Sequence, residues 1–138
     1  MTDIMFSIPG KVSGKGRPKF ARRGKFVTAY TPEKTRAMES VVKQYAAEEM
    51  RGKKLLNGPL SLAIRVYQHC PEAWSKKRKA AANWITGKPD ADNIIKLIGD
   101  SLNGIVWTDD SQVANLTFSR RYTSTAEEVW VFVEELKQ

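Results

Sequence analysis

Two pairs of aspartates are the residues of this sequence best suited to chemistry. Asp90 and Asp92 stand where the chain is expected to enter a helix, and Asp109–Asp110 form a second pair beyond an apolar run. Short aspartate side chains offer rigidly held oxygen ligands, which hard cations such as Mg²⁺ and Mn²⁺ prefer. Three or four carboxylates converge if both turns lie at the same end of the sheet, so the pattern predicts a divalent-cation site.

A lysine one helical turn beyond the first pair extends this prediction. Lys96 follows Asp92 by four residues and therefore shares its helical face. Its ammonium would stabilise the charge on a scissile phosphate, while a bound metal polarises a phosphoryl oxygen and activates water. Three carboxylates within about 5 Å would repel by roughly 3 kcal/mol per pair at an effective dielectric near 20. Such a cluster needs a cation or protons.

Each of these residues also has a purely structural interpretation. Asp92 alone is better explained as a helix N-cap than as a metal ligand, and Asp109–Asp110 alone as a polar turn. Lys96 with Asp92 would be an ordinary ion pair, which Asp100 would extend into a surface ladder. The catalytic interpretation gains support only when both aspartate pairs, Lys96 and the basic segment described below are taken together.

The remaining composition excludes several other classes of protein. One His and one Cys cannot build a usual zinc site, and Cys70 alone cannot form an internal disulfide. No stretch approaches the roughly 18 apolar residues of a membrane span, and the first residues lack the features of a signal peptide. We therefore expect a cytoplasmic protein with no membrane partner.

Residues 10–30 form a strongly basic segment within a chain that already has a formal net charge of +8. The segment holds seven Lys and Arg residues and no acidic one, so we expect a basic loop that follows the phosphates of a nucleic acid. Arg22 to Lys25 are expected to close a short hairpin, with Gly24 at a positive φ. The predicted phosphate contacts are Lys15, Arg17, Lys19, Arg22, Arg23 and Lys25.

Alternating and helical apolar patterns predict the elements that position these residues. Strands are expected at residues 3–8, 60–67, 113–122 and 128–135, and helices at 91–102 and over about 18 residues from Thr31–Pro32. An insertion at about 71–87 is expected to hold a short surface helix, with Lys76 to Lys79 as a solvated face. These elements indicate a single domain (residues 1–138) of the α+β class, in which a small mixed β-sheet carries two main helices.

The first helix has a predicted apolar face. Its members follow the helical period and are Met38, Val41, Val42, Tyr45 and Ala46.

Three motifs carry a resemblance to a known family. Residues 90–96 read D-x-D-N-x-x-K, and residues 109–113 read D-D-x-Q-V at the matching separation. Near the N-terminus, G-K-x-R-P at 14–18 is followed by T-P-E-K at 31–34. Together they resemble the RusA family of Holliday-junction resolvases, of the phage and prophage type. The resemblance touches nearly the whole chain and is weakest at residues 68–87.

The resemblance implies a small homodimeric, Mg²⁺-dependent endonuclease that recognises four-way DNA junctions by shape and nicks two opposing strands symmetrically. By position, the metal-binding carboxylates would be Asp90, Asp92 and Asp110, with Lys96 as the essential positive group and Mn²⁺ as a substitute ion. Ala91 departs from the larger apolar residue of many members, which should affect packing only. A bacterial or phage source is implied.

A rival interpretation is a non-catalytic protein that binds branched DNA or RNA. The intact acidic set argues against it, because a pure polyanion binder has no reason to place carboxylates beside its basic surface. Among the aromatic residues, Trp130, Phe132 and Tyr122 are interpreted as core or dimer interface. Phe20 and Phe26 are candidates either for stacking on unpaired bases or for packing within the hairpin.

Overall fold

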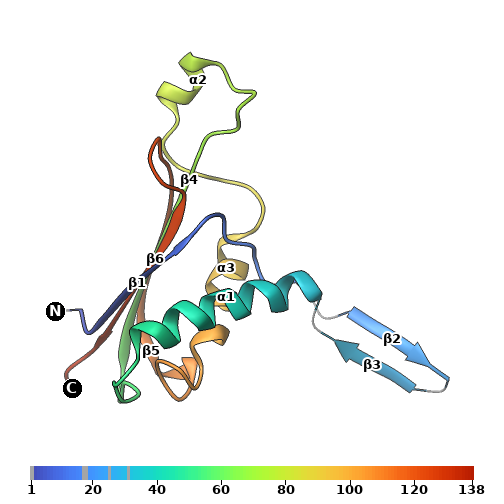
Figure 1. Cartoon of the computed structure of the whole chain (residues 1–138), viewed down its shortest axis with the longest axis vertical. Helices are drawn as coiled ribbons and strands as arrows, with labels where there is room; N and C mark the ends of the chain where they lie inside the picture. The colour runs from blue at the N-terminus through green and yellow to red at the C-terminus, as the bar shows by residue number, and fades with distance from the viewer. Residues whose placement is uncertain (1, 17–18, 25, 31) are drawn as a thin grey trace.

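A four-stranded mixed sheet carries the rest of the chain (Figure 1). The computed structural model describes residues 2–16, 19–24, 26–30 and 32–138, and of residues 19–23 and 26–30 it describes the backbone. The sheet order is β1 (Ile4–Pro9), β6 (Glu128–Glu135), β4 (Leu60–Gln68) and β5 (Val113–Tyr122). Strands β1–β6 and β6–β4 pair antiparallel and β4–β5 pair parallel, which confirms a mixed sheet in an α+β fold.

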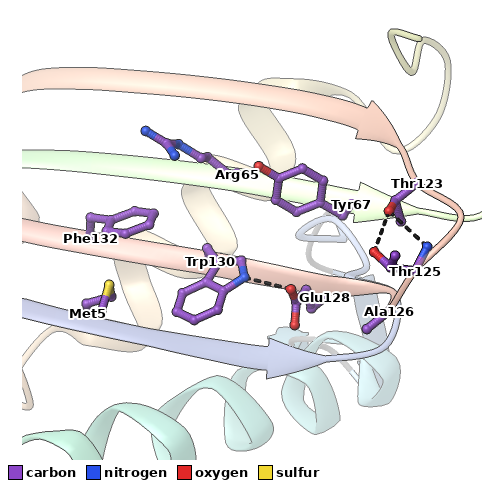
Figure 2. A pocket seen from close by; sticks show the side chains of 9 residues that line it. All are labelled: Met5, Arg65, Tyr67, Thr123, Thr125, Ala126, Glu128, Trp130 and Phe132. Atoms are coloured by element: carbon purple, nitrogen blue, oxygen red, sulfur yellow. Dashed lines mark hydrogen bonds between the residues drawn. The ribbon is translucent and has the colours of Figure 1, made fainter.

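One face of the sheet is left uncovered by the helices of the described residues. Successive residues of a strand point to opposite faces, and on this outer face Trp130 and Phe132 of β6 lie beside Arg65 and Tyr67 of β4 (Figure 2). Met5 of β1 is opposite Phe132 in the register and is half exposed. The outer face is therefore aromatic and open.

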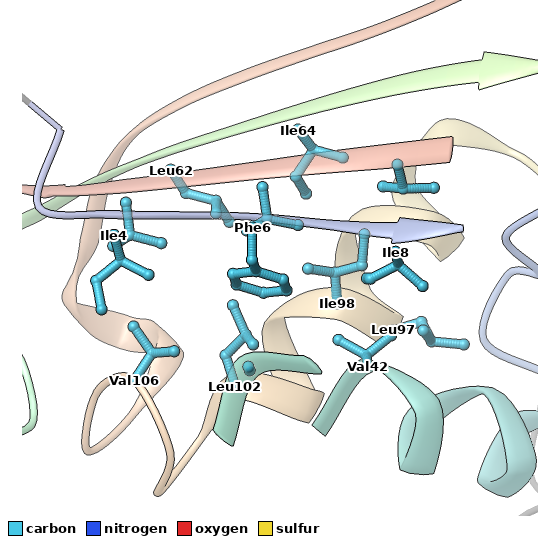
Figure 3. Close-up of a cluster of buried hydrophobic side chains, with 14 of the residues drawn as sticks. Ile4, Phe6, Ile8, Val42, Leu62, Ile64, Leu97, Ile98, Leu102 and Val106 are labelled. Carbon is cyan, nitrogen blue, oxygen red and sulfur yellow. The ribbon is translucent and has the colours of Figure 1, made fainter. Parts of the chain in front are cut away.

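The other face of the sheet forms the hydrophobic core with helices α1 (Glu33–Glu49) and α3 (Ala91–Leu102) (Figure 3). Strands β1, β4 and β6 contribute their alternate apolar residues, so the inward side chains interdigitate with one stripe of each helix. The largest fully buried members are Ile4, Ile8, Leu60, Leu62, Ile64, Val66, Val42, Ile94, Leu97, Ile98, Leu102 and Trp107.

Helix α1 matches its predicted length but not its predicted face. Val42 and Ala46 are buried as expected, whereas Val41 and Tyr45 are 37% and 38% exposed. The prediction that all of these residues share one buried face was therefore wrong. The buried residues Thr35, Val42 and Ala46 form a narrow line along the helix, which contacts β1 and α3. The predicted N-cap, Thr31, lies outside the described residues, and the helix follows Pro32.

Two smaller elements project from the sheet and helices (Figure 1). Strands β2 (Lys19–Arg23) and β3 (Phe26–Tyr30) pair as the expected hairpin, with Gly24 at φ 59°. The insertion contains α2 (Lys76–Ala81), which is exposed along its whole length. Among the described residues, none of the helices is both long enough and apolar enough to cross a membrane.

Trp107 fixes the connection that follows α3. Its side chain has no exposed surface, and its Nε1 donates a hydrogen bond to Asn103 Oδ1 at 2.7 Å. Backbone bridges join Trp107 to Leu56 and Asn103, and the Gly104 amide donates to the Trp107 carbonyl at 2.7 Å. This indole therefore sets where the second aspartate pair, two residues later, is placed.

Trp107→Ala is expected to lower the free energy of unfolding by about 3–5 kcal/mol, because it leaves a large cavity and an unpaired Asn103. Trp84→Ala is the matched control, since Trp84 is 59% exposed and its loss should change stability by less than about 0.5 kcal/mol. Urea denaturation of both variants measures the difference. Equal midpoints would show that Trp107 is not a structural anchor.

Candidate active site

The start of α3 positions the first aspartate pair. Asp90 occupies the N-cap position with extended backbone (φ −64°, ψ 151°), and its carbonyl accepts from the Asn93 and Ile94 amides at 3.1 and 3.2 Å. Its side chain makes no capping bond and instead accepts from Lys88 Nζ at 3.1 Å. Asp92 is exposed in the first turn. Both carboxylates are thus presented to solvent, where they are available to a ligand.

Lys96 is exposed on the solvent side of α3. Among the described residues, no acidic side chain lies within 4.0 Å of its ammonium, so the alternative ion pair with Asp92 is not formed. Its role beside the scissile phosphate stays a prediction.

The beginning of the basic segment packs between α1 and α3. The Lys15 amide donates to the Asn93 carbonyl at 3.0 Å, and the Gly16 amide donates to Thr35 Oγ1 at 2.9 Å. A Cβ on Gly14 would lie only 2.7 Å from Pro89 Cβ, so the close approach requires glycine. The basic segment is therefore anchored to the same turn that carries Asp90.

The side chain of Lys15 lies against two carboxylates and is only partly exposed to solvent. Its ammonium donates to Asp100 Oδ2 and lies 3.9 Å from Glu39 Oε2, with the side chain 24% exposed. The hydrogen bond to Asp100 is the main cause that raises the pKa of Lys15. Lys15, predicted as a phosphate contact, already neutralises carboxylates between α1 and α3.

Asp110 is placed by a short 3₁₀ helix, η1 (Asp110–Gln112), with a capping box at its start. Asp109 Oδ2 accepts from the Ser111 amide at 3.0 Å, and Gln112 Oε1 accepts from the Asp109 amide at 3.1 Å. Gln112 Nε2 donates to the Leu56 and Gly58 carbonyls at 3.3 and 3.1 Å, which ties η1 to the loop before β4. The Asp109 carboxylate is therefore engaged in capping the start of η1.

Asp110 reaches α3 beside Gly99. A Cβ on Gly99 would lie 3.7 Å from Asp110 Oδ2, an ordinary van der Waals distance, so the carboxylate lies directly beside this turn of the helix. Desolvation, followed by the contact with the Asp100 carboxyl and the charge of Asp109, raises the pKa of Asp110. The hydrogen bonds from Ser111 instead lower the pKa of Asp109. The two adjacent aspartates therefore have opposite electrostatic environments.

The carboxylates that the structure brings together differ from those expected. Asp110 meets Asp100, which lies eight residues and therefore about 12 Å along the helix axis from Asp92. Asp90 and Asp92 stay at the helix start. In the described ranges, no three His, Cys or acidic side chains gather closely enough to hold a metal ion. From the sequence, Asp100 was expected only to extend a surface series of ion pairs, and no pattern indicated Glu39.

These residues fit a divalent cation in the chemistry of their donors. All are carboxylates, the oxygen ligands that Mg²⁺ and Mn²⁺ prefer. Desolvation and the contact with the Asp100 carboxyl raise the pKa of Asp110, so its ionised form is disfavoured at this place. A cation beside the pair would favour the ionised form, although the described residues supply no third ligand there.

The predicted phosphate contacts fall largely in the hairpin. Arg17 and Lys25 lie outside the described residues, and Lys19, Arg22 and Arg23 belong to β2, of which the backbone is described. The side chains of Phe20 and Phe26 are likewise outside the description. Figure 1 shows the hairpin reaching away from the sheet, beyond the start of α1.

A cavity of about 370 Å³ lies on the open outer face of the sheet. The Trp130 and Phe132 rings stack there with centroids 6.0 Å apart, and the Arg65 guanidinium lies 5.0 Å from the Phe132 centroid (Figure 2). Trp130 Nε1 donates to Glu128 Oε1 at 2.7 Å. These groups face away from the helices that carry the aspartates, so the cavity is separate from the candidate active site.

Two comparisons show which known proteins this chain is similar to. A family model described as endodeoxyribonuclease RusA matches residues 9–134. A relative from Bacillus subtilis (strain 168), described as uncharacterized protein YqaN, is 33% identical over 129 residues, covering 89% of this chain and 90% of that relative. The family match runs from the end of β1 into β6 and includes both aspartate pairs.

Asp110→Asn is expected to stabilise the metal-free protein at neutral pH. Because the folded pKa of Asp110 is raised, its ionised form weakens the fold, and this penalty grows as the pH rises through that pKa. Solvent screening limits the gain to about 0.5 kcal/mol, and it should vanish near pH 3, where the carboxyl is protonated in both states. Thermal melts in EDTA across this pH range measure it.

Asp109→Asn is the matched control, with the same change of charge one residue away. The pKa of Asp109 is lowered by folding, so this substitution should slightly destabilise the protein at neutral pH. Equal shifts of the two variants in the same direction would contradict the proposed difference between the aspartates.

Proposed function

Because the chain belongs to the RusA endodeoxyribonuclease family, we propose that it resolves four-way (Holliday) DNA junctions by hydrolysing phosphodiester bonds in two opposing strands symmetrically. The observation that carries this proposal is the family match over residues 9–134, which includes the aspartates and Lys96 in their expected order. Such a substrate places the protein in the cytoplasm of a bacterial or phage-infected cell.

We propose Mg²⁺ as the cofactor, with Mn²⁺ as a substitute. By their positions in the family motifs, Asp90, Asp92 and Asp110 would hold the ion, which would require Asp110 to lie nearer the start of α3 than its contact with Asp100 places it. When bound, it supplies a Lewis acid that polarises a phosphoryl oxygen and lowers the pKa of a water molecule. Asp100 would act indirectly, since it touches Asp110 and is itself held by Lys15.

Lys96 would stabilise the charge that develops on the scissile phosphate. Its exposure and its lack of a carboxylate within 4.0 Å among the described residues leave the ammonium available to an anion. It lies one helical turn from Asp92, on the same face of α3. A fixed cation aimed at developing charge acts mainly in the transition state.

The β2–β3 hairpin would hold the DNA backbone. Lys15 anchors the start of the basic segment on Asp100, so the phosphate contacts would come from Lys19, Arg22 and Arg23, with Arg17 and Lys25. Contacts of this kind position a junction without reading its sequence. The hairpin and the anchored loop thus connect DNA binding to the turn that presents Asp90.

A homodimer would cover the open outer face of the sheet. Stacked Trp130 and Phe132, with Arg65 and Glu128 close by, combine apolar area with charges of both signs on one surface. A two-fold axis brings the same patch of two copies together, so Arg65 of one copy could meet Glu128 of the other. Two copies would supply two active sites for two nicks.

Asp90→Asn, Asp92→Asn and Asp110→Asn are each expected to abolish Mg²⁺-dependent nicking of a synthetic four-way junction. Lys96→Ala should lose most of the cleavage rate, about 10²–10³-fold, with little change in junction affinity. Gel analysis of end-labelled junctions measures cutting, and binding in EDTA measures affinity. Linear duplex and an RNA hairpin should stay intact.

Asp109→Asn again provides the control, because it keeps a capping side chain and should cut nearly as fast as the wild type. Binding of the junction by the wild type without any nicking in Mg²⁺ or Mn²⁺ would favour the non-catalytic rival. A variant of Asp90, Asp92 or Asp110 that cuts at a substantial rate would remove that residue from the site.

Trp130→Lys together with Phe132→Lys is expected to convert a dimer into a monomer, because four like charges would meet at the two-fold axis. Sedimentation equilibrium measures the mass, and circular dichroism checks that the sheet persists. Lys53→Glu, on a distant exposed loop, serves as the control. A wild-type monomer at micromolar concentration would contradict the homodimer.

A further inference from the structure

The insertion lobe, residues 71–87, carries positive charge on an exposed helix at one extremity of the molecule (Figure 1). Helix α2 contributes the run Lys76 to Lys79, and Glu72 is the one acidic residue in the lobe's sequence. No residue of α2 is buried, so packing does not explain the lobe's composition.

Two tryptophans of the lobe each lie against an arginine. The Arg78 guanidinium carbon is 3.7 Å from the Trp74 ring centroid, and that of Arg121, from β5, is 4.2 Å from the Trp84 centroid. Trp74 also meets the Tyr122 ring edge-on at 5.4 Å. Guanidinium groups stacked on indoles restrain the rings and keep a positive charge beside them.

Trp84 is fixed in place but not covered. An antiparallel bridge joins it to Arg121, the Ile85 amide donates to the Arg120 carbonyl at 3.1 Å, and the Tyr122 amide donates to the Asn83 carbonyl at 2.9 Å. Yet the side chain remains 59% exposed, the largest exposure among the big apolar residues described. These backbone hydrogen bonds thus hold Trp84 in place while most of its indole ring stays exposed to solvent.

A cavity of about 580 Å³ lies between these aromatic groups. Trp74, Trp84 and Tyr122 line it together with Arg78 and Asn83, and no carboxylate lines it. A ligand with a flat ring and negative charge fits this lining of aromatic rings and a guanidinium group. Unpaired nucleotides have both, because every base has a π-face and every linkage a phosphate.

We propose that the insertion lobe binds unpaired bases of the branched DNA, with one base stacked on Trp84 and the adjoining phosphates along α2. This inference rests on the proposed function for the nature of the substrate. In Figure 1 the lobe and the β2–β3 hairpin project to different sides of the molecule. The lobe is therefore a second DNA contact, distinct from the phosphate contacts of the hairpin, and it is insensitive to base identity because stacking is.

Fluorescence anisotropy tests the inference. It measures how tightly the full-length protein in EDTA binds a fluorescein-labelled oligothymidylate of twelve nucleotides. Trp84→Ala should weaken binding roughly 5- to 150-fold, the effect of losing one base–aromatic stack. Trp84→Phe should restore much of the affinity, because a ring is retained. In the wild type, the oligonucleotide should quench tryptophan fluorescence, and Trp84→Phe should lose most of this quenching.

The charge of α2 is tested separately. Lys76→Ala with Lys77→Ala should lower the slope of log affinity against log salt by up to about 1.4, whereas Lys53→Ala with Lys54→Ala should not. An unchanged affinity and unchanged quenching in Trp84→Ala would overturn the inference and assign the lobe to a protein partner. Absence of nicking by the wild type would overturn the proposed function instead.

Discussion

The burial of one face of α3 is the constraint on which the candidate site depends. Ile94, Leu97, Ile98 and Leu102 have no exposed surface, so the helix cannot rotate against the sheet without exposing several large side chains. With that face fixed inward, the 3.6-residue period places Asp92 and Lys96 outward. The orientation of the chemical groups is therefore a consequence of core packing, and no interaction among the polar residues has to maintain it.

Two other parts of the chain approach this fixed helix. Gly14 allows the basic segment to pack against Pro89 and Asn93, and η1 places Asp110 beside Gly99. As a result, opposite charges reach α3, Lys15 onto Asp100 and Asp110 beside it. The lysine compensates part of the acidic charge, while desolvation and the neighbouring carboxyls raise the pKa of Asp110.

Local patterns predicted the elements well because each depends on residues close in sequence. Strand β6 and helix α3 have the predicted bounds, since alternation defines the strand and a strong apolar stripe with clear ends defines the helix. The inward face of α1 was predicted too broadly, because exposure of Val41 and Tyr45 depends on how the helix crosses its neighbours. The contact between Asp110 and Asp100, and the ion pair of Lys15, are tertiary, and no spacing in the sequence encodes them.

The fold keeps three surfaces apart, namely the outer face of the sheet, the β2–β3 hairpin and the insertion lobe. Alternation sends apolar residues of β4 and β6 toward the helices and leaves Arg65, Trp130 and Phe132 on the outer face, so the same strands both support the helices and form the aromatic outer face. Helix α2 of the insertion lobe buries no residue, so its basic composition is not required by the core. The chain of 138 residues therefore carries its basic hairpin and lobe on elements other than those that carry the aspartates.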